Sequence, residues 1–233
     1  MQQKPSMSES SAGLSRRRFC QALAALAAVL CMPRLALAGA YDEYFKAVKL
    51  DLPAQVSSLL RRGMDPNTVE PERGDTGLIL ALREGSAKVF DLLLHTRDVN
   101  LDARARNGDT ALMIAAYKGN VAAVKALLEQ GAEVNQTGWT ALHYAAAVGN
   151  NEIVQLLLDQ SAYIDAESPN QTTPIMMAAR GGHILTVKLL LDEGADATLK
   201  NGAGMTAIDF AREGGFKDIV EGLTYRLKKA GKL

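Results

Sequence analysis

A stretch of ten residues recurs five times along the chain, and this repetition limits the possible folds more than any other feature. The copies are TGLILALREG from Thr76, TALMIAAYKG from Thr110, TALHYAAAVG from Thr140, TPIMMAARGG from Thr173 and TAIDFAREGG from Thr206. The starting threonines are almost evenly spaced along the chain. Self-similarity at a nearly fixed period is typical of repeat proteins, in which each unit packs only against its neighbours.

A second apolar pattern follows each copy. In VAAVKALLEQGAEVN, from Val121, the residues Val124, Leu127 and Leu128 have the three- and four-residue spacing that places side chains on one face of a helix. The threonine at the start of each copy can cap a first helix, and a glycine such as Gly149 can end it. Each unit is therefore predicted to be helix, turn, helix, loop, and the fold class to be all-α.

The two patterns together resemble the ankyrin repeat family, with T-P-L-H-x-A-A-x-x-G followed by V-x-x-L-L-x-x-G-A. The resemblance covers roughly residues 41 to 233 and implies a solenoid of about six repeats. The first repeat is a degenerate cap that keeps Val56, Leu59, Leu60 and Gly63 but lacks the threonine start. The loop NQTGWT of the fourth unit is about three residues shorter than the family pattern. A blunted loop finger is expected there.

One of the chain's three histidines, His143, lies within a repeated stretch. The equivalent positions of the other copies hold Ile79, Met113, Met176 and Asp209, and these residue types share no proton-transfer chemistry. A catalytic role for His143 is therefore not expected. The family resemblance implies a structural role instead, in which the histidine ties the start of its helix to a neighbouring loop.

No enzyme motif accompanies the repeats. The sequence lacks the GxSxG elbow, the GxxxxGK[ST] phosphate loop and the HExxH zinc motif. Both cysteines, Cys20 and Cys31, precede the repeats, so the usual cysteine-containing ligand sets for zinc are missing from them. We predict no catalytic residue, no cofactor and no metal site.

The segment 1–38 differs in composition from the repeats. Arg16, Arg17 and Phe19 lie in SRRRF, which resembles the twin-arginine export motif, and an alanine- and leucine-rich stretch follows. Ala36 and Ala38 form an A-x-A cleavage site. We predict a signal peptide over 1–38 and an ankyrin repeat domain over 39–233, located in a bacterial periplasm without a stable membrane anchor after cleavage. An uncleaved anchor or a buried helix are the alternatives for this segment.

The charge of residues 39–233 bears on the class of partner. Their formal net charge is −4, which does not attract nucleic acid or anionic lipid. The expected partner is another protein, bound by a chain that is monomeric alone. The alternative function is an exported structural protein, or one that escorts a partner through the twin-arginine route.

Ankyrin repeats bind partners through their loop fingers and the outward side of their first helices, and the resemblance places the binding residues there. A row of apolar side chains follows the histidine position, and it either lines a partner groove or completes the core between repeats. The chain's only tryptophan, Trp139, is expected on the short finger. The predicted partner-binding residues are Arg73, Leu80, Arg106, Asn107, Asp109, Ile114, Tyr117, Lys118, Trp139, Tyr144, Asn170, Met177, Arg180, Met205 and Phe210.

Overall fold

The computed structural model describes residues 33–232, and the chain divides into two compact units, 1–46 and 47–233. The described part of the first unit is helix α2 (Pro33–Lys49), whose last three residues belong to the second unit. The backbone of Ala36 and Ala38 lies in this helix. Arg16, Arg17 and Phe19 lie outside the described residues, and the signal peptide remains a prediction.

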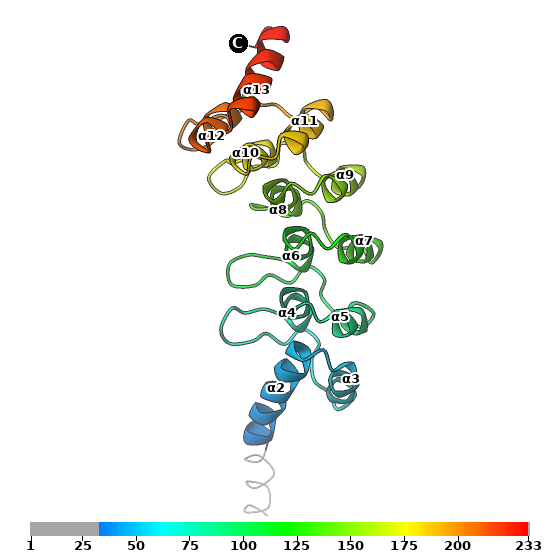
Figure 1. The fold of residues 1–233 in the computed structure, drawn as a ribbon. Helices are drawn as coiled ribbons and strands as arrows, with labels where there is room; N and C mark the ends of the chain where they lie inside the picture. Colours follow the sequence, from blue (N-terminus) through cyan, green and yellow to red (C-terminus); the bar gives the residue numbers. More distant parts are fainter. Residues whose placement is uncertain (1–32, 233) are drawn as a thin grey trace, which may run out of the picture. The chain divides into compact units, whose positions relative to one another are not determined.

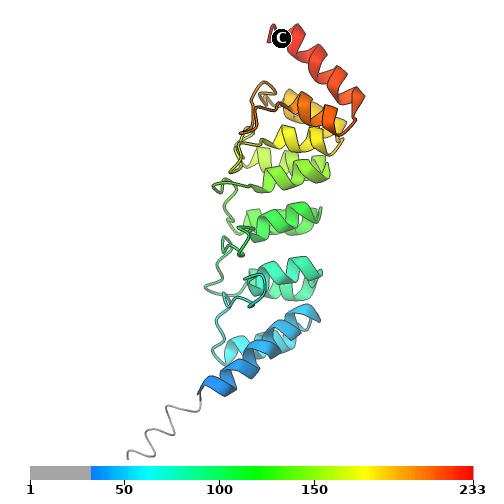
Figure 2. The same cartoon turned by 90° about the vertical axis from the view of Figure 1, so that its left-hand side faces the viewer.

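The second unit consists of helices in two rows joined by loops that project to one side (Figures 1 and 2). The inner row, on the loop side, contains α4 (Gly77–Glu84), α6 (Ala111–Tyr117), α8 (Ala141–Val148), α10 (Pro174–Arg180) and α12 (Ala207–Glu213). The outer row contains α3 (Pro53–Arg61), α5 (Ala87–Leu94), α7 (Val121–Glu129), α9 (Asn151–Asp159), α11 (Ile184–Asp192) and α13 (Lys217–Lys229). Within residues 33–232 the β-structure is one isolated bridge between Val69 and Thr76. The all-α solenoid predicted from the repeats is confirmed.

The start of each inner helix explains the mixed residue types at the histidine position. Met113 Sδ, His143 Nδ1, Met176 Sδ and Asp209 Oδ2 each accept a hydrogen bond from the backbone N–H of the threonine that caps the helix. These side chains share an acceptor atom at the third helical position, the arrangement of a capping box. Ile79 lacks such an atom, so the second repeat forgoes this bond.

Small residues let the inner helices approach one another closely. Their paired alanines are almost completely buried, for example Ala115 and Ala116 in α6 and Ala145 and Ala146 in α8. On the outer row, Val124 and Leu127 of the stripe predicted from the sequence are fully buried, as is Leu157, whereas Leu128 is half-buried. Burial of a leucine side chain contributes roughly 1.5–3 kcal/mol. Stacking therefore supplies the core that a single repeat cannot form.

A ladder of polar side chains joins successive loops. The side-chain oxygens of Asn67, Asp102, Asn135 and Asp165 accept hydrogen bonds from backbone N–H groups of the following repeat, at 2.6, 2.9, 2.8 and 3.0 Å respectively. Each rung spans roughly one repeat length and satisfies a loop amide that lacks a helical partner. The ladder fixes each loop against the next one.

Two glycines between the helices of a repeat make room for a side chain of the next repeat. A Cβ atom at Gly149 would lie 2.4 Å from the ring of His183, and one at Gly182 would lie 2.4 Å from the ring of Phe216. Both glycines also have positive φ, 73° and 75°, where an L side chain is strained. The same residue thus ends its own helix and accommodates its neighbour.

Over the described range, no helix combines the length and the apolar character needed to cross a membrane.

Candidate binding site

His143 is fully buried and supports the site through hydrogen bonds at both ring nitrogens. Its Nδ1 accepts a hydrogen bond from the Thr140 N–H at 3.1 Å, so its Nε2 carries the proton, which it donates to the carbonyl oxygen of Thr172 at 2.8 Å. Burial lowers the pKa of His143 to about 4. The ring is therefore neutral at pH 7 and links the start of α8 to the next loop. This geometry confirms the predicted structural role.

The loop before α8 is the shortest of the connections between repeats. It spans residues 130–140, three residues fewer than the loops 160–173 and 193–206. In Figure 1 the loops before α4 and α6 extend far from the helices, whereas the loop before α8 stays close to them. The predicted blunting of this finger is confirmed. The short loop 130–140 leaves a gap in the row of fingers beside Trp139 and Tyr144, and we call this gap the notch.

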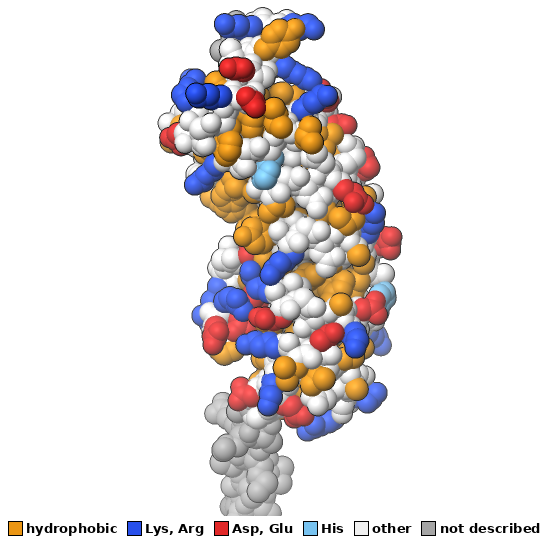
Figure 3. Space-filling view, viewed as in Figure 1, with side chains coloured by type: hydrophobic (Ala, Val, Ile, Leu, Met, Phe, Trp, Pro, Cys, Tyr) orange, Lys and Arg blue, Asp and Glu red, His pale blue; other side chains and the backbone are white. Residues whose placement is uncertain are grey.

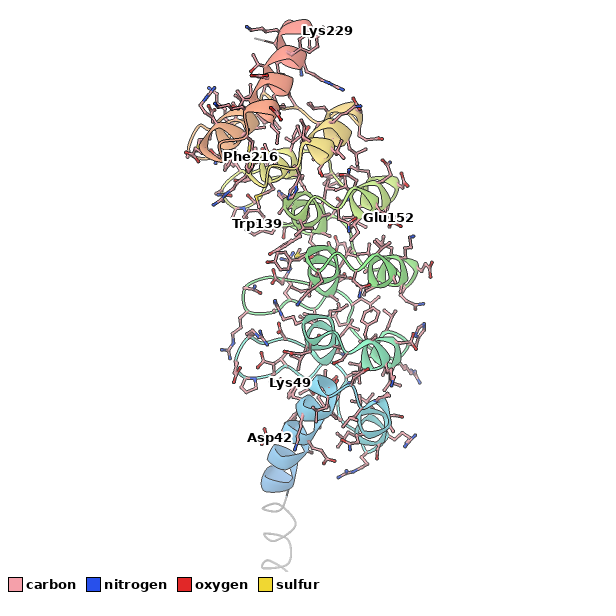
Figure 4. The ribbon with its side chains drawn as sticks, in the orientation of Figure 1. Asp42, Lys49, Trp139, Glu152, Phe216 and Lys229 are labelled. Atoms are coloured by element: carbon pink, nitrogen blue, oxygen red, sulfur yellow. The ribbon has the colours of Figure 1, made fainter. Side chains whose placement is uncertain are left out.

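Three aromatic side chains meet at the notch. The Trp139 ring contacts the ring of His143 with centroids 5.2 Å apart, and the ring of Tyr144 with centroids 6.5 Å apart. Tyr117, from α6, contacts Tyr144 edge to face at 6.0 Å. Tyr117 is 55% exposed, and Trp139 and Tyr144 are part-buried. Figure 4 shows Trp139 on the loop side of α8, while Glu152 points away from the outer row at α9.

A polar network anchors the tyrosine of this aromatic cluster. The Tyr144 hydroxyl donates to Asp109 Oδ1 at 2.6 Å, and Arg83 Nη2 donates to Asp109 Oδ2 at 2.9 Å. Asn107 Nδ2 also donates to Asp109 Oδ2, at 2.7 Å. Charge-assisted hydrogen bonds of this kind are short and directional. They hold Tyr144 in one orientation across three repeats.

The other end of the network is a buried carboxylate. Asp75 is fully buried, and its Oδ2 lies 2.9 Å from Arg83 Nε and 3.4 Å from Arg73 Nε. The Arg83 contact is an ion pair whose geometry falls outside that of an aligned hydrogen bond. Burial raises the pKa of Asp75, and the two arginines oppose that rise. Arg73 also contacts Glu84, at 3.6 Å.

The structure divides the predicted partner-binding residues into two sets. Arg73, Arg106, Asn107, Tyr117, Lys118, Asn170 and Arg180 are exposed, and Trp139, Tyr144, Met177 and Met205 are part-buried. These eleven residues lie on the loops and inner helices, where a partner can reach them.

The other four residues require a correction. Leu80, Ile114 and Phe210 are 0%, 1% and 7% exposed, so they pack in the core between repeats and do not present a surface. Asp109 is 5% exposed, and its carboxylate is already occupied by Arg83, Asn107 and Tyr144. The apolar row is therefore core at three of its five positions and part-exposed only at Tyr144 and Met177.

Sequence reasoning did not select Arg83, although this residue connects two repeats. It bridges Asp75 and Asp109, which lie one repeat apart in the chain. The available signal was an arginine directly after the buried pair Ala81 and Leu82, at a position where the next repeat has Tyr117. Its partners lie in two different loops, and no local pattern links them.

Within residues 33–232, no cluster of three or more histidine, cysteine or acidic side chains could hold a metal ion.

Helix pairs stacked at a nearly constant period, with one row of projecting loops, define the class of this protein as a helical-repeat solenoid. Comparison with known families gives a more specific assignment. A family model described as "Ankyrin repeats (3 copies)" matches residues 45–137, 97–168 and 161–230. The chain belongs to the ankyrin repeat family, whose repeats are protein–protein interaction modules.

Three curated relatives illustrate the similarity. SH3 and multiple ankyrin repeat domains protein 2 of Homo sapiens is 36% identical over 161 residues, 67% of this chain and 9% of the relative. The B-cell lymphoma 3 protein homolog of Mus musculus is 31% identical over 187 residues, 77% of this chain and 42% of the relative. The photoreceptor ankyrin repeat protein of Homo sapiens is 37% identical over 87 residues, 36% of this chain and 19% of the relative. The chain spans less than half the length of each of them.

Proposed function

We propose that this protein is a non-catalytic binding module that acts in a bacterial periplasm and recognises another protein through its loop fingers and inner helices. The observation that carries the binding surface is the partly exposed aromatic cluster of Tyr117, Trp139 and Tyr144 at the notch. Tryptophan and tyrosine are among the residues that most often dominate the binding energy of protein interfaces. The location rests on the export motif around Arg16 and Arg17.

The rigid support of the cluster is a further argument for binding. Trp139 rests on the His143 ring, which has hydrogen bonds at both nitrogens, and Tyr144 is bonded to Asp109. A side chain that is already held in place loses little conformational freedom when a partner arrives. The frame therefore favours binding at these aromatic residues over other exposed positions.

Capture from the periplasm with the tagged full chain, followed by identification of the bound protein, supplies the partner for a quantitative test. Tyr117→Ala and Trp139→Ala should each weaken its binding by roughly 2–4 kcal/mol, the range of hot-spot residues. Tyr225→Ala is the matched control, because Tyr225 is 67% exposed and lies on the last outer helix, α13. Equal losses in all three variants, measured by calorimetry on folded protein, would refute the proposed surface.

The proposed location has its own test in the full chain. Replacing Arg16 and Arg17 by lysine should leave the precursor in the cytoplasm, because the paired arginines are read by a dedicated export receptor. Amino-terminal sequencing of the exported wild-type protein should begin at Gly39. An unchanged periplasmic yield of the lysine variant would show that the chain uses another route.

A further inference from the structure

The notch lies between two inner helices that end in cationic residues. Lys118 caps the carboxyl end of α6, and Arg180 is the last residue of α10. Both are exposed, and neither has an ion-pair partner among the described residues. Between them lies α8, the helix that carries Tyr144.

The three central inner helices lack acidic residues altogether. The sequences of α6, α8 and α10 are ALMIAAY, ALHYAAAV and PIMMAAR, whereas the flanking helices α4 and α12 contain Glu84, Asp209 and Glu213. This distribution differs from that of the chain, because residues 39–233 carry a formal net charge of −4. The positive charge is therefore local to the ends of α6 and α10, while the loops 130–140 and 160–173 carry the exposed Glu133 and Glu167.

The finger beside the notch adds to this charge. Arg106 is exposed at the tip of the preceding loop, where its guanidinium donates to the backbone carbonyl of Glu72, at 3.1 Å. Asp109 lies in the same loop, but it is buried and already bonded to Arg83 and Tyr144. The exposed cation of this loop that contacts loop 130–140 is Arg104, which donates to Gln136 Oε1 at 2.6 Å and to the carbonyl oxygen of Thr137 at 3.1 Å. The exposed Asp98 of the same loop follows α5 closely in the chain and pairs with Arg97.

The shape of the surface complements its charge. In Figure 3 the outline of the molecule is hollowed on the finger side at the level of α8, and hydrophobic side chains are visible there. Tyr117 supplies an exposed ring at this place, and Trp139 and Tyr144 supply part-buried ones. An apolar side chain entering the notch would contact aromatic surface, while groups on either side of it would face Lys118, Arg104 and Arg180.

We propose that the notch receives a partner segment in which a large apolar side chain is flanked on both sides by carboxylates. This inference rests on the proposed binding function and adds the chemistry of the partner and its point of entry. Complementary charges steer and align the partner, and the aromatic contact retains it. The short loop 130–140 is then a determinant of specificity, because a finger of ordinary length would fill the entry.

Synthetic peptides of about 12 residues, long enough to cross a groove in extended form, provide the probes. The first has a central Leu-Phe pair with glutamates on both sides. The second has lysines in place of the glutamates, and the third has Ser-Ser in place of Leu-Phe. Trp139 is the only tryptophan, so its fluorescence reports binding at the notch directly. Only the first peptide should change that emission, and added salt should weaken its binding.

Two pairs of variants test the geometry, with labelled peptide and fluorescence anisotropy as the readout. Insertion of Gly-Asn-Gly between Thr137 and Gly138 should reduce affinity for the first peptide about tenfold or more, by filling the notch. The same insertion between Ala203 and Gly204 lengthens a distant finger and should have little effect. Lys118→Glu and Arg180→Glu should each reduce affinity about tenfold, whereas Lys88→Glu, on the outer helix α5, should leave it unchanged.

The outcomes separate this inference from the function on which it rests. The inference is overturned if the lysine peptide binds as well as the glutamate peptide, if no peptide binds, or if the two insertions act equally. In each of these cases the proposed function still stands or falls with the effect of Tyr117→Ala on the captured partner. Thermal unfolding of every variant establishes that a lost signal does not come from unfolded protein.

Discussion

Helices α6 and α8 occupy equivalent places in neighbouring repeats, but they follow loops of different length. The loop before α6 spans residues 95–110 and the loop before α8 spans 130–140. At the same position of the repeat, Ile114 is buried while Tyr144 is part-exposed. Met177, on the next inner helix α10, is also part-exposed. The same position of the repeat is therefore core in some repeats and part-exposed in others.

The same pair of helices differs in how the capping position connects to the following repeat. Met113 accepts the N–H of its own Thr110, whereas His143 accepts from Thr140 and also donates to Thr172 in the next loop. The histidine therefore adds a bond between repeats next to the shortened finger. The repeat with the shortest loop therefore has an additional hydrogen bond to the next repeat.

The largest effect on stability is expected at the buried members of the apolar row, such as Ile114. Ile114→Ala should lower the free energy of unfolding by about 2–5 kcal/mol, because it leaves a cavity in a closely packed site. Met177→Ala should cost clearly less, since its side chain already reaches the surface. Urea denaturation of both variants measures the difference, and equal losses would contradict the division into core and surface.

A fall in pH should destabilise the repeat capped by His143 but not the repeat capped by Met113, because only the histidine titrates. Burial lowers the folded-state pKa of His143 to about 4. The stabilisation that the neutral ring gives the folded state is therefore fully present above pH 6.5 and is lost as pH falls toward 4. The loss over that window is about 3 kcal/mol for a lowering of this size. His143→Met supplies the acceptor already used by Met113 and Met176, without a titrating group.

The measurement is the free energy of unfolding of the wild type and of His143→Met at pH 7 and pH 4. The acidic groups are the same in both proteins, so their titration cancels in the comparison. The wild type should lose about 3 kcal/mol more than the variant. Parallel pH profiles would show that the ring is not buried as a neutral group in solution.

A smaller effect on stability is expected at Tyr144, which α8 has where α6 has Ile114. Tyr144→Phe removes the hydroxyl that donates to Asp109, and should cost about 1–2 kcal/mol because a buried carboxylate loses one of its donors. Tyr117→Phe is the matched control and should change stability by less than about 0.5 kcal/mol. If thermal melts show no difference between the two variants, the polar network does not support the aromatic cluster.

The smallest effect is expected at the exposed cation of α6. Lys118→Ala should change the free energy of unfolding by less than about 0.5 kcal/mol, because the residue is exposed and makes no ion pair within the described part of the chain. The same denaturation assay checks this value. A larger loss of unfolding free energy would mean that Lys118 contributes to the stability of the fold and is not simply a surface charge available to a partner.

Sequence periodicity was sufficient to predict the helix pairs, because these depend on patterns within one repeat. The family resemblance implied the loop fingers and the structural role of His143. Neither could decide which members of the apolar row are exposed. Leu80 and Tyr144 have the same place in the pattern, but Leu80 is buried, whereas Tyr144 is part-exposed and bonded to Asp109 in the loop of another repeat. Arg83 was missed for the same reason, since Asp75 and Asp109 come together only after stacking.

The glycines that accommodate His183 and Phe216 bear on how such a chain can change over generations. Each is constrained twice, by the left-handed turn of its own repeat and by the ring of the next one. A point substitution at Gly149 or Gly182 must satisfy both repeats at once. Duplication of the repeat that holds Gly182 and His183 meets both demands, because the copy brings both the glycine and a ring that fits the glycine before it. Growth by whole units is therefore easier for this stack than drift at these glycines.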